Sequence, residues 1–104
     1  MWYGSYYDGP GSVRWQEIAR VRPVKIPGWE YLDCCIWKRP GGDWEIVEGH
    51  TGMLISMGQL TRGEAVALAR QALDKAGREK VDSTIADTVA RQGESPRYRK
   101  EDIE

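Results

Sequence analysis

Residues 29–77 constrain the fold more than any other part of the chain, because three short apolar runs lead directly into a helix with both of its ends marked. The runs are residues 29–37, 43–48 and 52–57, and each is rich in β-branched or aromatic residues and bounded by Gly or Pro. Short, Gly-rich connections separate them, as expected for two successive hairpins. This stretch therefore predicts an antiparallel meander followed by a helix.

The lengths of the connections predict a strand register. If residues 39–42 close a four-residue loop, Trp37 lies opposite Trp44 and Asp33 lies opposite Glu48, an unfavourable like-charge pair. One face of the sheet then carries Trp37, Cys35, Trp44, Ile46, Ile55 and Met57. The opposite face carries Leu32, Cys34, Ile36, Val47 and Leu54. The second face is too apolar to remain exposed, so we expect the C-terminal helix to cover it, with the N-terminal arm or a second copy of the chain as alternatives.

The helix that follows the meander has signals at both ends. Thr61 is placed as its N-cap with Glu64 three residues later, and Gly77 provides the left-handed stop. Apolar residues at helical spacing make one Ala-rich stripe, which suits close packing on a sheet: Ala65, Leu68, Ala69, Ala72, Leu73 and Ala76. A second helix is predicted over residues 79–92, with Gly93 as its end.

The ends of the chain carry weaker patterns. Residues 1–12 mix Gly and Pro with four aromatic rings, which predicts a flexible arm without regular structure. Residues 13–22 fit either a helical turn or a strand with a bulge, and the strand is favoured because it puts Arg14, Gln16, Arg20 and Arg22 on one face. Residues 94–104 are charged and predict a frayed tail.

A chain of 104 residues is long enough for one hydrophobic core. The sequence therefore predicts a single α+β domain over residues 13–93. Its expected architecture is an antiparallel meander of three or four strands, with one long amphipathic helix packed on a face and a second, C-terminal helix. No apolar run approaches the roughly 20 residues of a membrane span, and the N-terminus lacks a leader pattern, so a cytoplasmic protein without membrane contact is expected.

The residues with reactive side chains do not assemble into a catalytic or metal signature. His50 falls in a predicted turn with no positioned partner, and we expect it to be exposed to solvent. Cys34 and Cys35 are neighbours on a strand, point to opposite faces and have no third thiol, so two buried free thiols are expected. The sequence thus predicts a non-enzymatic protein without a cofactor.

Basic and aromatic residues of the first strand and first hairpin are the candidate binding site. A row of cations interleaved with tryptophan suits a nucleic-acid backbone and its bases, although a solvated strand face is the alternative. The net charge is −1, so no global field favours nucleic acid. The predicted partner-binding residues are Trp15, Arg20, Arg22, Lys25, Trp29, Lys38 and Arg39. The aromatic residues are all Trp or Tyr, with no Phe, which favours half-buried rings at interfaces.

One part of the chain resembles a known family. The run Trp44-Glu45-Ile46-Val47-Glu48, the turn at Gly52, Gly58, and then Thr61-Arg62-Gly63-Glu64-Ala65 with Ala69 are similar to the βββα core of small prokaryotic proteins of the HicB-like antitoxin type and of small bacterial and phage proteins. HicB-like proteins return to a strand after this helix, whereas residues 78–104 here predict a helix and a tail.

The resemblance implies a non-enzymatic protein that occludes a partner. The leading functional expectation is therefore inhibition or neutralisation of a protein partner, as by an antitoxin or a phage-encoded inhibitor such as an anti-CRISPR. A small nucleic-acid-binding module that uses the basic row is the first alternative. A structural homodimer is the second.

Overall fold

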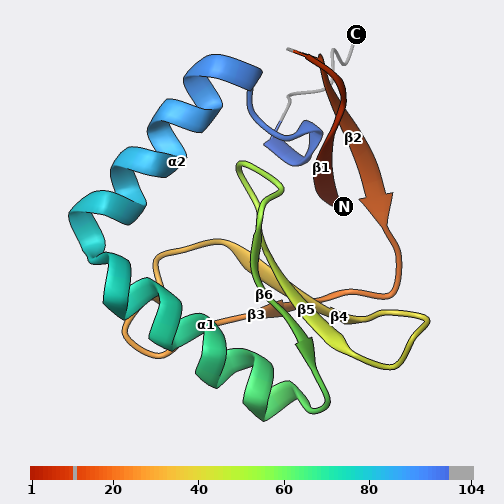
Figure 1. Cartoon of the computed structure of the whole chain (residues 1–104), viewed down its shortest axis with the longest axis vertical. Helices are drawn as coiled ribbons and strands as arrows, with labels where there is room; N and C mark the ends of the chain where they lie inside the picture. Colours follow the sequence, from red (N-terminus) through yellow and green to blue (C-terminus); the bar gives the residue numbers. More distant parts are fainter. Residues whose placement is uncertain (11, 99–104) are drawn as a thin grey trace, which may run out of the picture.

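The computed structural model describes residues 1–10 and 12–98 (Figure 1). These residues form the α+β fold that the sequence predicts. The elements in chain order are β1 (Trp2–Gly9), β2 (Ser12–Ile18), β3 (Arg22–Val24), β4 (Cys34–Lys38), β5 (Trp44–Glu48), β6 (Leu54–Gln59), α1 (Arg62–Ala76), α2 (Arg78–Gln92) and the short 3-10 helix η1 (Pro96–Tyr98). Neither α-helix of this described part is long and apolar enough to cross a membrane.

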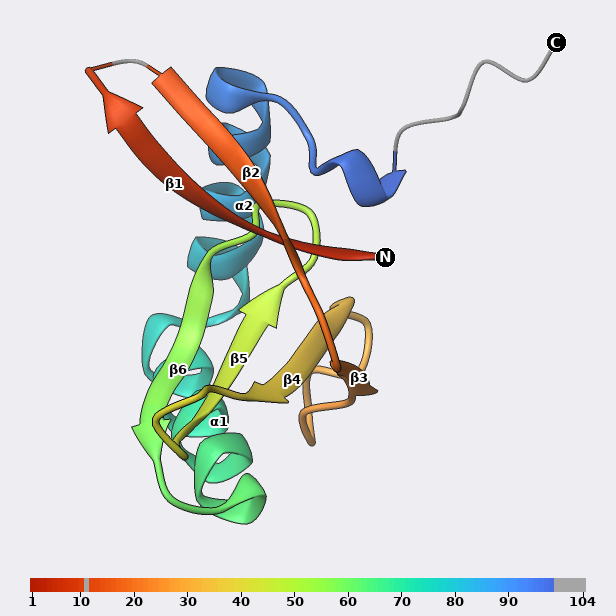
Figure 2. The same cartoon turned by 90° about the vertical axis from the view of Figure 1, so that its right-hand side faces the viewer.

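The strands form two antiparallel sheets. The predicted meander is a four-stranded sheet of order β3-β4-β5-β6, and β1 pairs with β2 in a separate hairpin. In Figure 2, α1 and α2 lie behind the four-stranded sheet, and the β1–β2 hairpin crosses at its upper end. Residues 13–18 are extended, as the favoured strand prediction requires, but the single bulged strand predicted over residues 13–22 is wrong, because β2 ends at Ile18 and β3 begins at Arg22 in the other sheet.

The absence of regular structure expected for residues 1–12 is wrong. Trp2 to Gly9 form β1, which pairs with β2 from Trp2 opposite Ile18 to Gly9 opposite Ser12. Gly9 has a φ of 148° and lies where the register shifts, so the glycine that suggested disorder marks the hairpin end instead. Residue 11 lies outside the described residues.

The β4–β5 pairing differs by one residue from the predicted register. Trp37 lies opposite Glu45, because the loop spans residues 39–43 rather than 39–42. A 2.8 Å hydrogen bond from the Arg39 amide to the Asp43 carbonyl closes it. The same slip removes Asp33 from the position opposite Glu48.

This slip changes which side chains of β4 face the helix, since neighbouring residues of a strand point to opposite faces. Cys34 and Ile36 face α1, whereas Cys35 and Trp37 face the other way. The predicted placement of Val47 away from the helix is correct. The second hairpin begins in the predicted register, with Val47 opposite Leu54, but β6 then shifts twice along its length.

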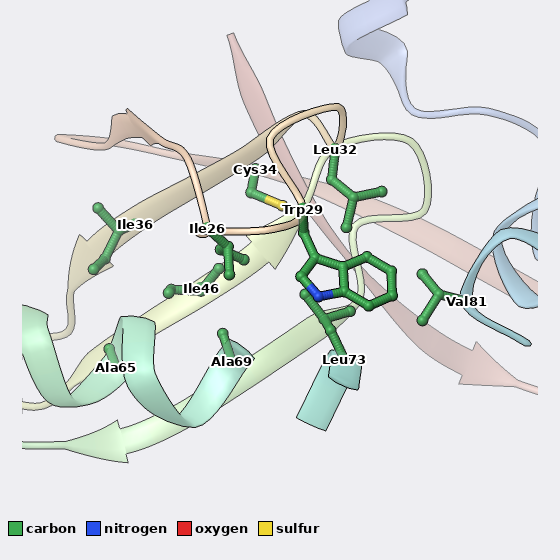
Figure 3. Close-up of a cluster of buried hydrophobic side chains, with 10 residues drawn as sticks. All are labelled: Ile26, Trp29, Leu32, Cys34, Ile36, Ile46, Ala65, Ala69, Leu73 and Val81. Atoms are coloured by element: carbon green, nitrogen blue, oxygen red, sulfur yellow. The ribbon is translucent and has the colours of Figure 1, made fainter. Parts of the chain in front are cut away.

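The main core lies between the sheet and α1 (Figure 3). Its buried members are Ile26, Trp29, Leu32, Cys34, Ile36, Ile46, Ala65, Ala69, Leu73 and Val81. Ala65 and Ala69 have no exposed surface, so the small side chains of the predicted stripe do bring α1 against the sheet. Ala72 and Ala76, which belong to the same predicted stripe, are exposed.

Both ends of α1 are as predicted. The Thr61 side chain accepts a 3.1 Å hydrogen bond from the Glu64 amide, and Gly77 ends the helix with a φ of 87°. α2 follows immediately and ends at Gly93, also as predicted.

The face of the sheet away from α1 is covered by the β1–β2 hairpin. Trp2 packs with Cys35 and Val47, and Ile18 of β2 lies against them. The expectation that the C-terminal helix covers this face is wrong, because α2 contributes Val81 to the core on the α1 side.

The start of the predicted charged tail is ordered. Ser95 is fully buried and its amide donates a 3.0 Å hydrogen bond to the His50 carbonyl. Arg97 pairs with Asp33 at 2.8 Å. The remainder of the tail, residues 99–104, lies outside the described residues.

Candidate nucleic-acid interface

A groove of about 710 Å³ opens beside β4 next to the first residue of β3. Arg22, the first residue of β3, lies opposite Ile36, so the last two residues of β4 have no neighbour on that side. The residues that line the groove are Ala19, Arg20, Arg22, Ile36, Trp37, Lys38, Arg39, Pro40, Gly42, Trp44 and Arg62. Five of them are cationic and, within the described part of the chain, none is acidic. The groove therefore concentrates positive charge in a protein whose net charge is close to zero.

Arg20 reaches the groove from the link between the two sheets. Its backbone φ is 59°, and among residues 1–10 and 12–98 it is the one residue other than glycine with a positive φ. The left-handed conformation costs a residue with a side chain about 1 to 2 kcal/mol. Strain of this kind is retained where the surrounding structure requires it and is common at functional sites.

Trp44 lines the groove, and two cations lie over its ring. The Lys38 Nζ atom lies 6.0 Å from the centroid of the indole, and the Arg62 guanidinium carbon lies 5.8 Å from it. Lys38 is the cross-strand partner of Trp44, and Arg62 is the first residue of α1. The β4–β5 pairing therefore brings Lys38 to the Trp44 ring, and the start of α1 brings Arg62 to the same ring.

Trp37 and Arg39 share a buried carboxylate. Glu45, with 8% of its side chain exposed, accepts hydrogen bonds from the Trp37 indole N–H at 3.1 Å and from Arg39 Nη1 at 2.8 Å. Asp43 lies 3.5 Å from Arg39 Nε. The hydrogen bond to Glu45, followed by the charge of Asp43, raises the pKa of the Arg39 guanidinium above its ordinary value. The charge of Arg39 is therefore balanced within the protein.

The other four cations of the groove are not balanced in this way. Among the described residues, no carboxylate lies within ion-pair distance of Arg20, Arg22, Lys38 or Arg62. Unbalanced cations around a concave surface attract anions, because no carboxylate of the described residues competes for them. Two indole rings beside them add flat apolar surface.

Four of the seven predicted partner-binding residues come together in this groove, namely Arg20, Arg22, Lys38 and Arg39. The other three do not line it. Lys25 is exposed on the chain beyond β3, and Trp15 is half-buried on β2. Trp29 is buried in the main core, where its indole N–H donates a 2.8 Å hydrogen bond to Asp74 of α1. Arg14 of the predicted row pairs with Asp8 at 3.0 Å.

The predicted site lacked the two tryptophans and one of the five cations of the groove. Trp37 and Trp44 were placed opposite each other by the predicted register, so neither was associated with the basic row. Arg62 follows the helix N-cap, and no local pattern indicates that α1 begins beside the first hairpin. A register with residues 39–43 as the loop would have placed Lys38 against Trp44.

A second polar cluster holds the C-terminal segment. The His50 ring stacks on the Tyr98 ring with centroids 4.1 Å apart, and His50 Nδ1 lies 2.9 Å from the buried Glu48 carboxylate. His50 lies in a turn, as predicted, but it is half-buried against Tyr98 and Glu48, so the expectation that it is exposed to solvent is wrong. Asp33 accepts hydrogen bonds from Arg97 and Tyr98. Burial raises the pKa of Asp33, but these two hydrogen bonds outweigh that effect and hold the pKa below its usual range.

The two cysteines are buried and free, as predicted. Burial raises the pKa of each thiol to about 12. In the described residues no group of three or more His, Cys, Asp or Glu side chains is arranged to hold a metal ion.

Comparison of the chain with protein-family models, with curated proteins and with solved structures finds no match to any of the three.

Proposed function

We propose that the protein binds single-stranded nucleic acid in the basic groove. The observation that carries the proposal is the convergence of four unbalanced cations and two tryptophans on one groove that no described acidic residue lines. Cations that follow a groove contact the phosphates, and aromatic rings stack on unpaired bases.

The rings favour a single strand over a duplex as the ligand. In a duplex the faces of the bases are stacked on one another, and a protein reaches only their edges. Trp37 offers a flat ring face rather than a hydrogen-bonding group suited to base edges. The near-neutral net charge also fits a local site better than a broad surface for duplex DNA.

The proposal is tested with a labelled oligothymidylate titrated by fluorescence anisotropy at several salt concentrations. Four phosphate contacts predict that the logarithm of the binding constant falls against the logarithm of salt concentration with a slope of about −3. Arg20→Ala and Arg22→Ala should each weaken binding and flatten that slope by about 0.7.

Lys25→Ala is the matched control for these two variants. Lys25 belongs to the same predicted basic row but does not line the groove, so its removal should leave the slope unchanged. No binding at low salt, where electrostatic attraction is strongest, would contradict the proposal.

Inhibition of a protein partner is a second candidate function, supported by exposed apolar side chains around β6. Met53, Leu54, Met57 and Leu60 have between 44% and 78% of their surface exposed. Met53 and Leu54 also line an apolar hollow of about 270 Å³ between β6, α1 and α2. Contiguous exposed apolar surface marks sites of protein interaction.

This second candidate is tested by co-purification with the products of neighbouring genes. Met57→Lys together with Leu60→Lys should abolish co-purification, whereas Arg22→Ala should retain it. The reverse result would assign the partner to the basic groove.

A further inference from the structure

A second hollow of about 370 Å³ lies between the β1–β2 hairpin and the face of the sheet that the hairpin covers. It shares two lining residues, Ala19 and Trp37, with the basic groove. The two hollows therefore meet at these residues. Trp37 thus borders both hollows, and a ligand in the groove lies next to the second hollow.

The second hollow differs from the groove in its chemistry. In the described structure no cation lines it, and its only charged residues are Glu17 and Glu45. The rest of its lining is apolar, as at Ile18 and Val47, or neutral and polar, as at Gln16. Such a hollow disfavours a phosphate, because no described cation lines it and the Glu17 carboxylate repels an anion. It suits a flat neutral group with polar edges, and its volume falls within the range of small-ligand sites.

Trp37 is the tryptophan whose ring is open to such a group. Its indole is held by the hydrogen bond to Glu45, which lies directly opposite it on β5. Among the described residues, no aromatic ring or cation stacks on it. Trp44, in contrast, already has Lys38 and Arg62 over its ring. A ring that is fixed in orientation and still open is preorganised for stacking.

We propose that the second hollow is a subsite for one unpaired base, which stacks on Trp37 while the adjoining phosphates lie in the basic groove. This inference rests on the proposed function and adds to it the place of the base. The phosphates of a nucleotide would lie in the cationic groove, and its uncharged base would lie in the second hollow, which no described cation lines. Glu45 acts as a positioning residue for Trp37.

The test compares two labelled probes with the same number of phosphates. One is an oligothymidylate of about four nucleotides and the other is an abasic strand of equal length. The wild-type protein is expected to bind the thymidine probe between about 5-fold and 150-fold more tightly, the range for stacking one base on an aromatic ring. Trp37→Leu is expected to bind both probes with equal affinity.

Two further variants make the test independent of whether Trp37→Leu folds. Ala19→Leu enlarges an exposed side chain at the junction of the hollows and should reduce the preference for the thymidine probe. Tyr7→Leu removes a ring of β1 that is 66% exposed and lines neither hollow, so the preference should persist. Thermal melting by circular dichroism establishes that each variant is folded.

The outcomes separate this inference from the proposed function. Equal binding of both probes by the wild-type protein would overturn the base subsite while leaving phosphate binding in the groove intact. Retention of the preference by folded Trp37→Leu or by Ala19→Leu would overturn it as well. Failure of the wild-type protein to bind either probe at low salt would remove the proposed function and the subsite together.

Discussion

Arg20 combines an unfavourable backbone conformation with a side chain in the basic groove. Because glycine adopts a positive φ without the clash that a Cβ atom causes, Arg20→Gly should remove strain at this position. Glycine also raises the entropy of the unfolded chain, which offsets part of the gain. We expect the free energy of unfolding to stay the same or to rise by about 1 kcal/mol in urea denaturation.

The same variant should bind oligothymidylate more weakly, since it lacks one of the four unbalanced cations. Stability and binding would then change in opposite directions at one residue. A clear loss of stability in Arg20→Gly would show instead that the arginine side chain supports the fold.

Asp33 should make the stability of the protein depend on pH in the acidic range. Its folded-state pKa is held below the ordinary value of 3.8, after partial burial is outweighed by the hydrogen bonds from Arg97 and Tyr98. A carboxyl with a lowered pKa contributes stability above its unfolded pKa and loses it as the pH falls through the folded value. The contribution is thus complete near neutral pH, begins to fall as the pH drops to about 3.8, and is lost as the pH falls through the lower folded-state pKa.

Comparison with Asp33→Asn isolates this contribution from those of other carboxyl groups. At pH 7 the variant should be less stable by about 1.5 to 3 kcal/mol in urea denaturation, the value of a hydrogen bond to a charged group. The difference between the two proteins should shrink as the pH is lowered past 3.8. A difference that is independent of pH would show that Asp33 acts without its charge.

At the scale of elements, α1 meets the sheet through two alanines that have no exposed surface. Ala69→Leu should force additional atoms into this contact and cost about 1 to 3 kcal/mol, because overpacking displaces the backbone or the neighbouring side chains. Ala72→Leu is the matched control, since Ala72 is exposed beside the apolar hollow next to β6. It should change the free energy of unfolding by less than about 0.5 kcal/mol. Equal effects of the two substitutions would contradict the observed orientation of α1, in which Ala69 faces the sheet and Ala72 faces solvent.

Helix ends could be predicted from the residues next to them in the sequence, whereas the pairing of strands and the packing of elements on one another were harder to predict. Thr61 and Gly77 act within a few residues of chain, and both ends of α1 follow from them. The register of β4 depends on whether Asp43 belongs to the strand or to the loop, and its contacts with Arg39 decide in favour of the loop. β1 was missed because its glycine-rich segment acquires order by pairing with β2.

The candidate site was predictable only where its residues are close in the chain. Arg20 and Arg22 form a local basic pattern, as do Lys38 and Arg39. Arg62 joins them through the packing of α1 on the sheet, which no sequence spacing reveals. Trp29, in contrast, was predicted to bind a partner at the surface. It lies in the core instead, where it donates a hydrogen bond to Asp74, a residue far away in the sequence.

At the scale of the whole molecule, the N-terminal hairpin completes a second, smaller core. Trp2 is 7% exposed and packs with Cys35 and Val47. The Arg97 guanidinium lies 3.6 Å from the Trp2 ring centroid, so the two ends of the described chain meet at this residue. Trp2→Ala should therefore destabilise the protein by about 3 kcal/mol.

The reactivity of the two cysteines shows which face of the sheet the Trp2→Ala substitution destabilises, because Cys34 and Cys35 lie on opposite faces. In the native protein both thiols should resist alkylation near neutral pH, because burial raises their pKa to about 12. Trp2→Ala should make Cys35 reactive while Cys34, on the α1 side, stays protected. Tandem mass spectrometry of the labelled peptide distinguishes the two neighbours. Simultaneous labelling of both would indicate that the domain unfolds as one unit.

The two register shifts in β6 bear on whether this protein stays dispersed in solution. β6 is an edge strand without a single charged residue, and its apolar side chains at Leu54 and Met57 are exposed. A straight strand of that composition would present an uninterrupted row of backbone donors and acceptors to other molecules, which is the starting point of fibril growth. The irregularities, one of them at Gly58 with a φ of 79°, break that row and twist it. The two register shifts thus hinder edge-to-edge aggregation through β6, a strand that lacks the lysine or proline that commonly protects an edge.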